Sequence, residues 1–399
     1  MGKKLVLLLL VGVLVLGLAG CGGQQAAEEP GQDQDAKEEP AASNEPIKIG
    51  IQGPITGKWA IEGTGFVNGA TILAQQINDE GGLLGRQVEI VEGDDKGEPK
   101  EAALVAQKMI SSGVVAVVGA YNSTNTDPIS DMYNEAGLLH ITPSSTATHL
   151  TEKGYTHFFR TAFLDNRQGL FAAEFMVNDL DKKKIAIIHD NTTYAKGLAE
   201  WTQKYIEEKG GEVVFIDAIK PGELDFNPTL TKVKDTNPEA LWFTGYFSEG
   251  GLLLSQARDM GMMVPFVAGN ANNNPDFFKI AGKSAIMEGG GTFIISEPGP
   301  SDLDNPEANK FVSDYESKYG EIPPSVWTLS AADAFRLIVS AIEETESTDA
   351  DTLAEYLRNV KDFPGITGPI NYDEKGDRKG TIHKAYKFDE NGSLVNWNA

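Results

Sequence analysis

The sequence predicts an α/β protein with two doubly wound, parallel-sheet lobes. Short apolar runs alternate with helical patterns along most of the chain, which is the order of βαβ units whose helices cover both faces of a parallel sheet. The same alternation starts again after residue 165. Residues 47–399 are also more than one hydrophobic core usually holds, so two lobes are expected.

The first half of this pattern supplies four strands and three helices. Apolar runs predict strands over 47–52, 88–91, 114–119 and 138–141. Phe66, Ala70, Leu73 and Ile77 recur at helical spacing and mark one face of the first helix. Pro99 predicts a helix near 100–110, because proline fits the first helical turn, and a third helix is expected near 126–136.

The second half repeats the rhythm. Strands are predicted over 185–189, 212–217, 240–244 and 265–267, with helices over 168–177, 195–209, 228–234 and up to about residue 260. A later helical face carries Trp327, Ala331, Phe335 and Ile338. We interpret this face as core rather than as a ligand-facing stripe. Residues 368–399 are expected to form short strands and turns.

Residues 1–20 have the anatomy of a signal peptide. Two lysines precede an apolar run over 5–16, which is shorter than an ordinary membrane span of about 20 residues. Leu18-Ala19-Gly20-Cys21 is similar to a bacterial lipobox, which implies that Cys21 is lipidated and becomes the new N-terminus. The alternative is an uncleaved anchor with an incidental cysteine. Residues 21–46 are acidic and lack apolar periodicity, so a disordered tether is expected.

Composition excludes several classes of function. With 34 Lys+Arg against 58 Asp+Glu, the chain has a formal charge of −24 and would repel a nucleic acid. The single cysteine cannot close an intramolecular disulfide or build a multi-cysteine metal site, and the five histidines lack a close ligand spacing. We therefore expect no metal and no cofactor.

Enzyme motifs are missing from the sequence. It contains no GxSxG nucleophile elbow, no P-loop and no HExxH. Gly63, Gly65 and Gly69 miss the GxGxxG spacing and are interpreted as allowing a turn. Asp94 and Asp95 are adjacent on a strand and so point to opposite faces, which disfavours a paired acid/base role. The chain is not expected to be an enzyme.

Polar residues follow two predicted strands of the first lobe, where ligands of doubly wound sheets bind. The run 120–128 contains Tyr121, Asn122 and Ser123 and leads into a helix whose N-terminus favours an anion. Its alternative reading is that Ser123, Thr124 or Thr126 is only a helix cap. Residues 142–146, with Ser144 and Thr146, are again rich in hydroxyls. Two such segments on neighbouring strands favour a carboxylate pocket.

The second lobe offers aromatic residues at equivalent places. Tyr194 and Tyr246 each follow a predicted strand, and Trp59 lies in the loop after the first strand. A tyrosine brings apolar area and one hydroxyl, which suits closing over a small molecule. The alternative for either tyrosine alone is an ordinary half-buried position.

Four stretches carry a resemblance to a known family: INDEGGLLGRQVEIVEGDD (77–95), ITPSSTATHLT (141–151), AIIHDNTTYAKG (186–197) and GPINYDEKGDR (368–378). They resemble the type I periplasmic-binding-protein family, most closely the leucine/isoleucine/valine-binding proteins of bacterial ABC importers. The resemblance covers residues 47–399. It implies two lobes joined by a three-stranded hinge, with lobe 1 formed by 47–164 plus about 296–372 and lobe 2 by 165–295 plus about 373–399.

The resemblance also implies roles for single residues. Ser123 takes the position that grips a ligand α-carboxylate, Thr146 contacts carboxylate and ammonium, and Ser144 offers a backbone carbonyl. Tyr194 and Tyr246 match the two tyrosines that close over the ligand.

Two positions depart from the leucine-type pattern. Asn270 stands where the family has an acid that pairs with the ligand ammonium, so another anion is needed, and Asp165 is a candidate. Glu62 stands where leucine-type binders present an aromatic ring. Both departures put leucine specificity in doubt.

The expected function is a monomeric, lipid-anchored binding protein on the extracytoplasmic face of the cell membrane. It would capture a branched-chain or similar amino acid by hinge closure and deliver it to an ABC permease and ATPase complex. The alternatives are the same clamp with an amide, urea or aromatic acid as cargo, and a ligand-sensing receptor subunit. Contact with the membrane would come through the lipid anchor only.

Overall fold

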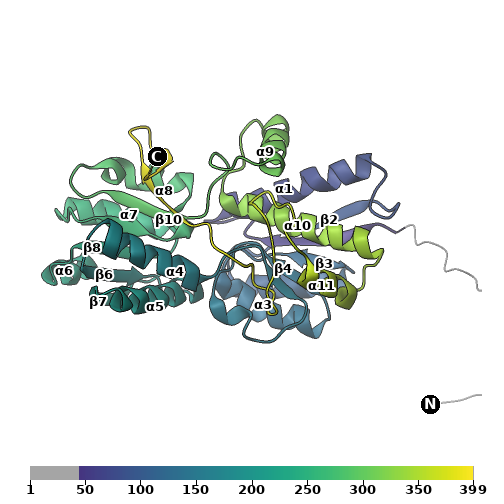
Figure 1. Cartoon of the computed structure of the whole chain (residues 1–399), viewed down its shortest axis with the longest axis horizontal. Coiled ribbons are helices and arrows are strands. Elements are labelled where there is room, and N and C mark those ends of the chain that lie inside the picture. The colour runs from purple at the N-terminus through teal and green to yellow at the C-terminus, as the bar shows by residue number, and fades with distance from the viewer. Residues whose placement is uncertain (1–44, 399) are drawn as a thin grey trace, which may run out of the picture. The chain divides into compact units, whose positions relative to one another are not determined.

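The computed structural model describes residues 45–398, so the predicted signal peptide, Cys21 and nearly all of the tether lie outside the described residues. Within this range, two sheets are built from different parts of the chain (Figure 1). No described helix is both long and apolar enough to cross a membrane.

The first sheet has five parallel strands in the order β2-β1-β3-β4-β5. The strands are β1 (Ile47–Gly53), β2 (Val88–Asp94), β3 (Ala116–Val118), β4 (Leu139–Thr142) and β5 (Phe158–Arg160). Ile49 pairs with Ile90 on one side and with Ala116 on the other. The four strands predicted from apolar runs are confirmed, and β5 is an edge strand that the pattern missed.

Helices cover both faces of this sheet, as the doubly wound prediction requires. The helices are α1 (Ala60–Asp79), α2 (Pro99–Ser111), α3 (Ser123–Glu135), α9 (Pro306–Tyr319), α10 (Val326–Thr345) and α11 (Ala350–Asn359). Ala116 and Val118 belong to the core shared with α1 and α10, whereas Val117 packs with α2 and α3. Successive strand residues point to opposite faces, so these two cores lie on opposite sides of β3.

The second sheet has seven strands in the order β12-β11-β10-β9-β8-β6-β7. They are β6 (Lys184–His189), β7 (Glu212–Ala218), β8 (Ala240–Thr244), β9 (Phe266–Ala268), β10 (Thr292–Ser296), β11 (Lys384–Phe388) and β12 (Leu394–Asn396). The first five are parallel, and β11 and β12 are added antiparallel at one edge. Its helices are α4 (Asp165–Glu174), α5 (Thr193–Glu208), α6 (Asn227–Asp235), α7 (Phe247–Asp259) and α8 (Pro275–Ala281).

The chain passes between the two groups of elements three times: between β5 and α4, between β10 and α9, and between α11 and β11. This is the connectivity that a three-stranded hinge requires. We call the group around the first sheet lobe 1 and the group around the second sheet lobe 2. The residue limits given above for each lobe remain a prediction.

The glycines of α1 correct one interpretation. Gly63, Gly65 and Gly69 lie inside the helix rather than in a turn. A Cβ on Gly63 would come within 2.3 Å of the Pro54 backbone, and one on Gly65 within 2.2 Å of Thr328 Oγ1 in α10. These glycines therefore let α1 approach its neighbours closely, which is a packing role.

Candidate ligand-binding site

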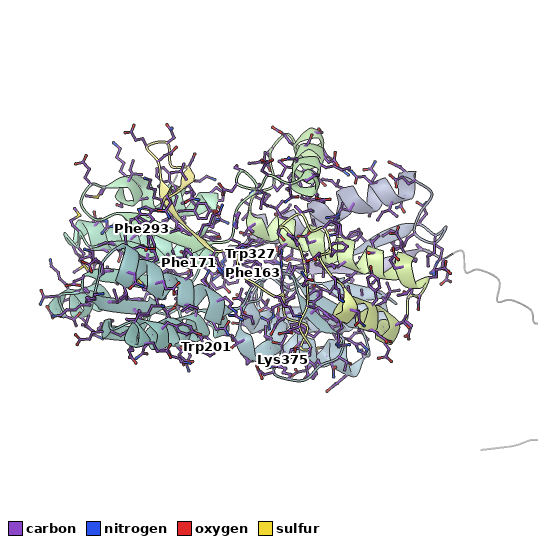
Figure 2. All side chains as sticks on the ribbon, viewed as in Figure 1. Phe163, Phe171, Trp201, Phe293, Trp327 and Lys375 are labelled. Atoms are coloured by element: carbon purple, nitrogen blue, oxygen red, sulfur yellow. The ribbon has the colours of Figure 1, made fainter. Side chains whose placement is uncertain are left out.

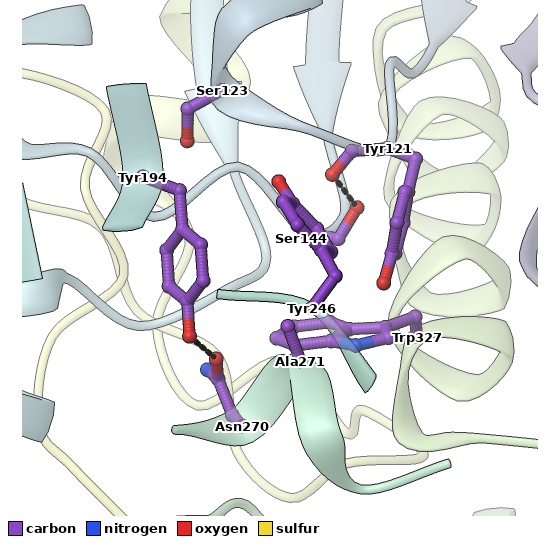
Figure 3. Close-up of a pocket in the computed structure, with 8 residues that line it drawn as sticks. All are labelled: Tyr121, Ser123, Ser144, Tyr194, Tyr246, Asn270, Ala271 and Trp327. Carbon is purple, nitrogen blue, oxygen red and sulfur yellow. Dashed lines mark hydrogen bonds between the residues drawn. The ribbon is translucent and has the colours of Figure 1, made fainter. Parts of the chain in front are cut away.

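A small cavity lies between the ends of the two sheets, and both lobes contribute to its wall (Figure 3). Its volume is about 10 Å³, which is room for about one water molecule. The lining residues are Tyr121, Ser123, Ser144, Tyr194, Tyr246, Asn270, Ala271 and Trp327. A larger molecule can enter only if the two walls separate.

Lobe 1 contributes two hydroxyl residues and a tyrosine. Ser123 is the first residue of α3, and its hydroxyl accepts from the backbone N–H of Ala147 at 3.3 Å. Ser144, just after β4, donates its hydroxyl to the carbonyl oxygen of Tyr121 at 2.7 Å (Figure 3). Thus the two segments that end neighbouring strands meet at the cavity, as the sequence predicted.

The helix cap in this region is Asn122. Its Oδ1 accepts from the backbone N–H of Asn125 at 2.8 Å. Asn122 is therefore the N-cap of α3, and the alternative that Ser123, Thr124 or Thr126 serves as the cap is wrong. Asn122 is buried but is not among the residues that line the cavity, so its predicted contact with a ligand remains a prediction.

Lobe 2 contributes two tyrosines and an amide. Tyr194 is in the first turn of α5, and Tyr246 directly precedes α7, with their ring centroids 5.6 Å apart. The Tyr194 hydroxyl donates to Oδ1 of Asn270 at 3.0 Å (Figure 3). Burial raises the pKa of both tyrosines, so their hydroxyls stay protonated and can donate to a ligand.

Four helices begin at the cavity wall, one of them α10, whose second residue is Trp327. Ser123 opens α3, Tyr194 is the second residue of α5, and Tyr246 precedes the first residue of α7. A helix N-terminus carries free N–H groups and the positive end of the helix dipole. Their convergence from two lobes favours a carboxylate in the space between them.

Aromatic rings close the remaining sides. Trp59 lies behind the wall, with its ring 4.3 Å from that of Tyr246 and 5.7 Å from that of Tyr121. Trp327, in the first turn of α10, lines the cavity itself. The interpretation of its helical face as core was therefore incomplete, since Trp327 is both buried and part of the wall. Its place in the first helical turn, shortly after Pro323 and Pro324, is the sequence signal that could have separated it from the stripe.

Thr146 and Asp165 lie together beside the cavity and are not among its lining residues. The backbone N–H of Asp165 donates to the carbonyl oxygen of Thr146 at 3.0 Å. Burial raises the pKa of the Asp165 carboxyl to about 7; the nearby Thr146 hydroxyl and Arg160 offset this only in part. Neither carboxylate oxygen makes a hydrogen bond of good geometry among the residues described.

Glu62 is not among the residues that line the cavity. Its Oε1 accepts from Nδ2 of Asn274 in lobe 2 at 2.8 Å, and its Oε2 accepts from the hydroxyl of Ser325 at 2.5 Å. The side chain is buried, and this burial raises its pKa from 4.5 to about 7. Glu62 thus contacts the opposite lobe directly and does not line the cavity, so its predicted contact with a ligand remains a prediction.

Asn270 is linked to an acid that the sequence analysis did not single out. Its Nδ2 lies 3.4 Å from Oε1 and 3.3 Å from Oε2 of Glu297, and Glu297 Oε1 lies 3.4 Å from Nε2 of His383. Burial raises the pKa of Glu297, but His383 and the hydrogen bonds outweigh burial and hold this pKa below its usual value. No local sequence pattern marks Glu297, because its contacts are made only in the folded chain.

Other contacts join the lobes around the cavity. The backbone N–H of Thr193 donates to Oγ1 of Thr124 at 3.2 Å, and Lys58 Nζ lies 3.7 Å from Glu249 Oε1. The lobes are therefore in direct contact in this structure. Among residues 45–398, no group of three or more His, Cys, Asp or Glu side chains could hold a metal ion.

The chain is similar to proteins of one known family. The family model described as "Periplasmic binding protein" matches residues 46–389. The chain is 35% identical to the leucine-, isoleucine-, valine-, threonine- and alanine-binding protein of Pseudomonas aeruginosa, over 86% of this chain and 90% of that protein.

Two solved structures are similar over 88% of this chain and 97% of each of theirs. One is the leucine-binding protein LivK of Thermotoga maritima, with a TM-score of 0.80 and 29% identity. The other is the substrate-binding protein LivJ of Streptococcus pneumoniae in complex with isoleucine, with a TM-score of 0.78 and 32% identity.

Proposed function

Because the chain belongs to the periplasmic binding protein family, a family of solute-binding proteins rather than enzymes, we propose that it captures a branched-chain or similar amino acid for an ABC importer. The ligand would bind between the lobes on the extracytoplasmic side and be handed to the permease. The residues of the cavity wall would hold it.

One observation carries the proposal: hydroxyls of lobe 1 face tyrosines of lobe 2 across a shared cavity at which four helices begin. Ser123 and the start of α3 suit a carboxylate, and the oxygen of Asn270 suits a donor such as an ammonium. The rings of Trp59, Tyr121 and Trp327 supply apolar area for a side chain. These are the groups that a zwitterionic, partly apolar ligand needs.

The mechanism is closure of the two lobes. A ligand stabilises the closed state only by the interactions that the open state cannot make. Here the hydroxyls that would bind a ligand carboxylate lie on lobe 1, and Tyr194, Tyr246 and Asn270 lie on lobe 2. A ligand can therefore contact both sets of groups only when the lobes meet. The permease would recognise the paired surfaces of the closed form.

Cargo identity separates the alternatives. The names of the relatives support an aliphatic amino acid. Because Asn270 carries no charge and does not require a ligand ammonium, an amide, urea or aromatic acid is the alternative ligand for the same site. A sensing role would use the same site with a receptor in place of the permease.

Thermal unfolding of the purified protein against amino acids, amides and aromatic acids tests the proposal. A ligand at one hundred times its Kd stabilises the folded protein by about 2.7 kcal/mol. The largest rise in Tm is expected from leucine, isoleucine, valine or a smaller amino acid. If only an amide or an aromatic acid raises the Tm, that compound replaces the amino acid as the proposed ligand. Chemical turnover of the bound ligand would contradict a binding function.

Membrane attachment is tested separately, because Cys21 lies outside the described residues. Wild-type protein is expected in the membrane fraction of expressing cells and Cys21→Ser in the soluble fraction. An unchanged distribution would remove the lipid anchor from the proposal and leave the ligand site untouched. Size-exclusion chromatography with light scattering tests the expected monomer.

A further inference from the structure

Glu297 is a buried carboxylate that lies one side chain behind the cavity. It directly follows β10, where the chain leaves the second sheet, and it is 3% exposed. Both of its oxygens face Nδ2 of Asn270, at 3.4 and 3.3 Å. Since Asn270 lines the cavity, a single amide group separates this carboxylate from a ligand.

These contacts determine which end of Asn270 faces the ligand. A primary amide has a donor nitrogen and an acceptor oxygen, and the nitrogen is turned toward Glu297. The oxygen is left on the side of Tyr194, whose hydroxyl donates to it at 3.0 Å. A carbonyl oxygen can accept two hydrogen bonds, so Oδ1 can also accept from an N–H group of a ligand.

Glu297 is more fully ionised at neutral pH than Asp165, the other buried acid beside the cavity. Despite its burial, His383 and the surrounding hydrogen bonds hold the pKa of Glu297 below its usual value. Burial instead raises the pKa of Asp165 to about 7, so Asp165 is only partly ionised at neutral pH. Of these two buried acids beside the cavity, Glu297 is the one that is ionised under ordinary conditions.

The existing contacts of Glu297 are long. Those with Asn270 and with Nε2 of His383 lie between 3.3 and 3.4 Å, whereas charge-assisted hydrogen bonds are commonly about 2.7–2.9 Å. Neither contact is a short charge-assisted hydrogen bond, so the charge of this carboxylate can still act on a cation on the far side of Asn270. The ring of His383 lies 6.0 Å from that of Phe163 and 6.4 Å from that of Phe171, centroid to centroid. Figure 2 labels both phenylalanines, near the boundary between the lobes.

We propose that Glu297 supplies the counter-charge for the ligand ammonium, acting as a positioning residue through Asn270. The inference rests on the proposed function, because it requires an amino-acid ligand. The ammonium donates to Oδ1 of Asn270, and the carboxylate behind the amide offsets the charge. The acid that the leucine-type pattern places at position 270 is thus replaced by an acid one side chain further back.

The test compares an amino acid with its des-amino analogue. Calorimetry would measure leucine and 4-methylpentanoate, or alanine and propanoate if alanine binds more tightly, on the wild type and on Glu297→Gln. The amino acid should bind about 30-fold more weakly to the variant, which corresponds to about 2 kcal/mol, because its ammonium loses the attraction of the carboxylate behind Asn270. The des-amino acid should bind equally well or better. Glu89→Gln, at an exposed position on β2, is the matched control and should change neither.

A charge swap separates the electrostatic role from a structural one. The double variant N270E/E297Q places one carboxylate at the cavity wall and removes the one behind it. It should restore amino-acid binding to within a few-fold of wild type. Equal weakening of both ligands by Glu297→Gln, without recovery in the double variant, would overturn the inference. If the wild type binds no amino acid, the proposed function fails instead.

Discussion

Glu62 gives the closed molecule a pH response that does not depend on a ligand. Its pKa is about 7 in the folded protein against 4.5 for the ordinary carboxyl, mainly because it is buried. The folded protein therefore holds this proton more tightly than the unfolded chain does. The contribution of Glu62 to stability is highest below about pH 4.5, falls as the pH rises toward 7, and is constant above it.

Glu62→Gln should remove this part of the pH dependence. The variant resembles the protonated side chain, and it should be more stable than wild type at pH 8 by on the order of 3 kcal/mol, with the difference vanishing near pH 4. Denaturant unfolding at a series of pH values measures it, with Glu89→Gln as the exposed control. A variant less stable than wild type at pH 8 would show that the ionised form is the one that binds Asn274 and Ser325.

Gly269 is required for the position of the Tyr194 hydroxyl. A Cβ at residue 269 would lie 2.5 Å from that oxygen and 3.1 Å from Cδ2 of Leu198. Gly269→Ala should therefore displace the ring and weaken ligand binding about tenfold or more, while the fold is retained. The size of the effect corresponds to roughly 1.4 kcal/mol, the cost of a small overpacking strain.

A double-mutant cycle checks the cause. In a Tyr194→Phe background the oxygen that clashes is absent, so Gly269→Ala should cost clearly less than it does in the wild type. Strictly additive losses of affinity would show that Gly269 acts through another contact.

At this scale the sequence predicted the cavity residues that directly follow strands. Ser123, Ser144, Tyr194 and Tyr246 were identified in this way and lie on the wall, as does Asn270, which only the family resemblance singled out. Contact of these residues with a ligand is still a prediction. Glu62 could not be placed, because its partner Asn274 is distant in the sequence. Glu297 was missed for the same reason, since nothing near it in the sequence indicates that it meets Asn270.

At the scale of elements, the starts of α3 and α5 are joined by one hydrogen bond between the lobes, from Thr193 N–H to Thr124 Oγ1. Thr124→Val keeps the shape and removes the acceptor. Ligand affinity should fall about fivefold, because one hydrogen bond contributes about 1 kcal/mol to the closed state.

Thr71→Val is the matched control, since Thr71 bonds only within α1, to the carbonyl oxygen of Val67. Calorimetry with the same ligand compares the three proteins. An unchanged affinity for Thr124→Val would mean that this contact adds nothing to closure.

Helices and strands were predicted correctly where the apolar pattern and the residues at the element boundaries were both clear. β1 has isoleucine at every second position from 47 to 51, β8 is an almost continuous apolar run, and α2 begins at Pro99. β5 has only three residues and no alternation to detect. β10 and α9 were also missed, although β10 reads Thr-Phe-Ile-Ile-Ser and α9 begins Asn305-Pro306 with an asparagine cap, so both signals were available. The pattern of short strands alone could not tell that β11 and β12 join the second sheet, because that pairing is long-range.

For the whole molecule, closure can be trapped covalently. Thr124 and Thr193 approach across the lobes, and the chain's only cysteine, Cys21, can be replaced. In a Cys21→Ser background, oxidised T124C/T193C should not release ligand that was bound before oxidation. It should not bind ligand that is added after oxidation. Radiolabelled-ligand release measures both, and dithiothreitol should reverse them.

Each single-cysteine variant serves as a control and should exchange ligand normally under oxidation. If the oxidised pair still exchanges ligand freely, entry and exit do not require the lobes to separate at this point.

The interleaving of the two sheets has a consequence for how the protein is made. The helices that complete one face of the first sheet, and the strands β11 and β12 that complete the second, are synthesised long after the strands they join. Pairings so distant along the chain form slowly, and partial chains leave apolar surface uncovered. A growing chain therefore cannot complete either core until late in synthesis. For a chain that is exported, this delay favours passage across the membrane before either core is complete. Folding would then finish on the extracytoplasmic side.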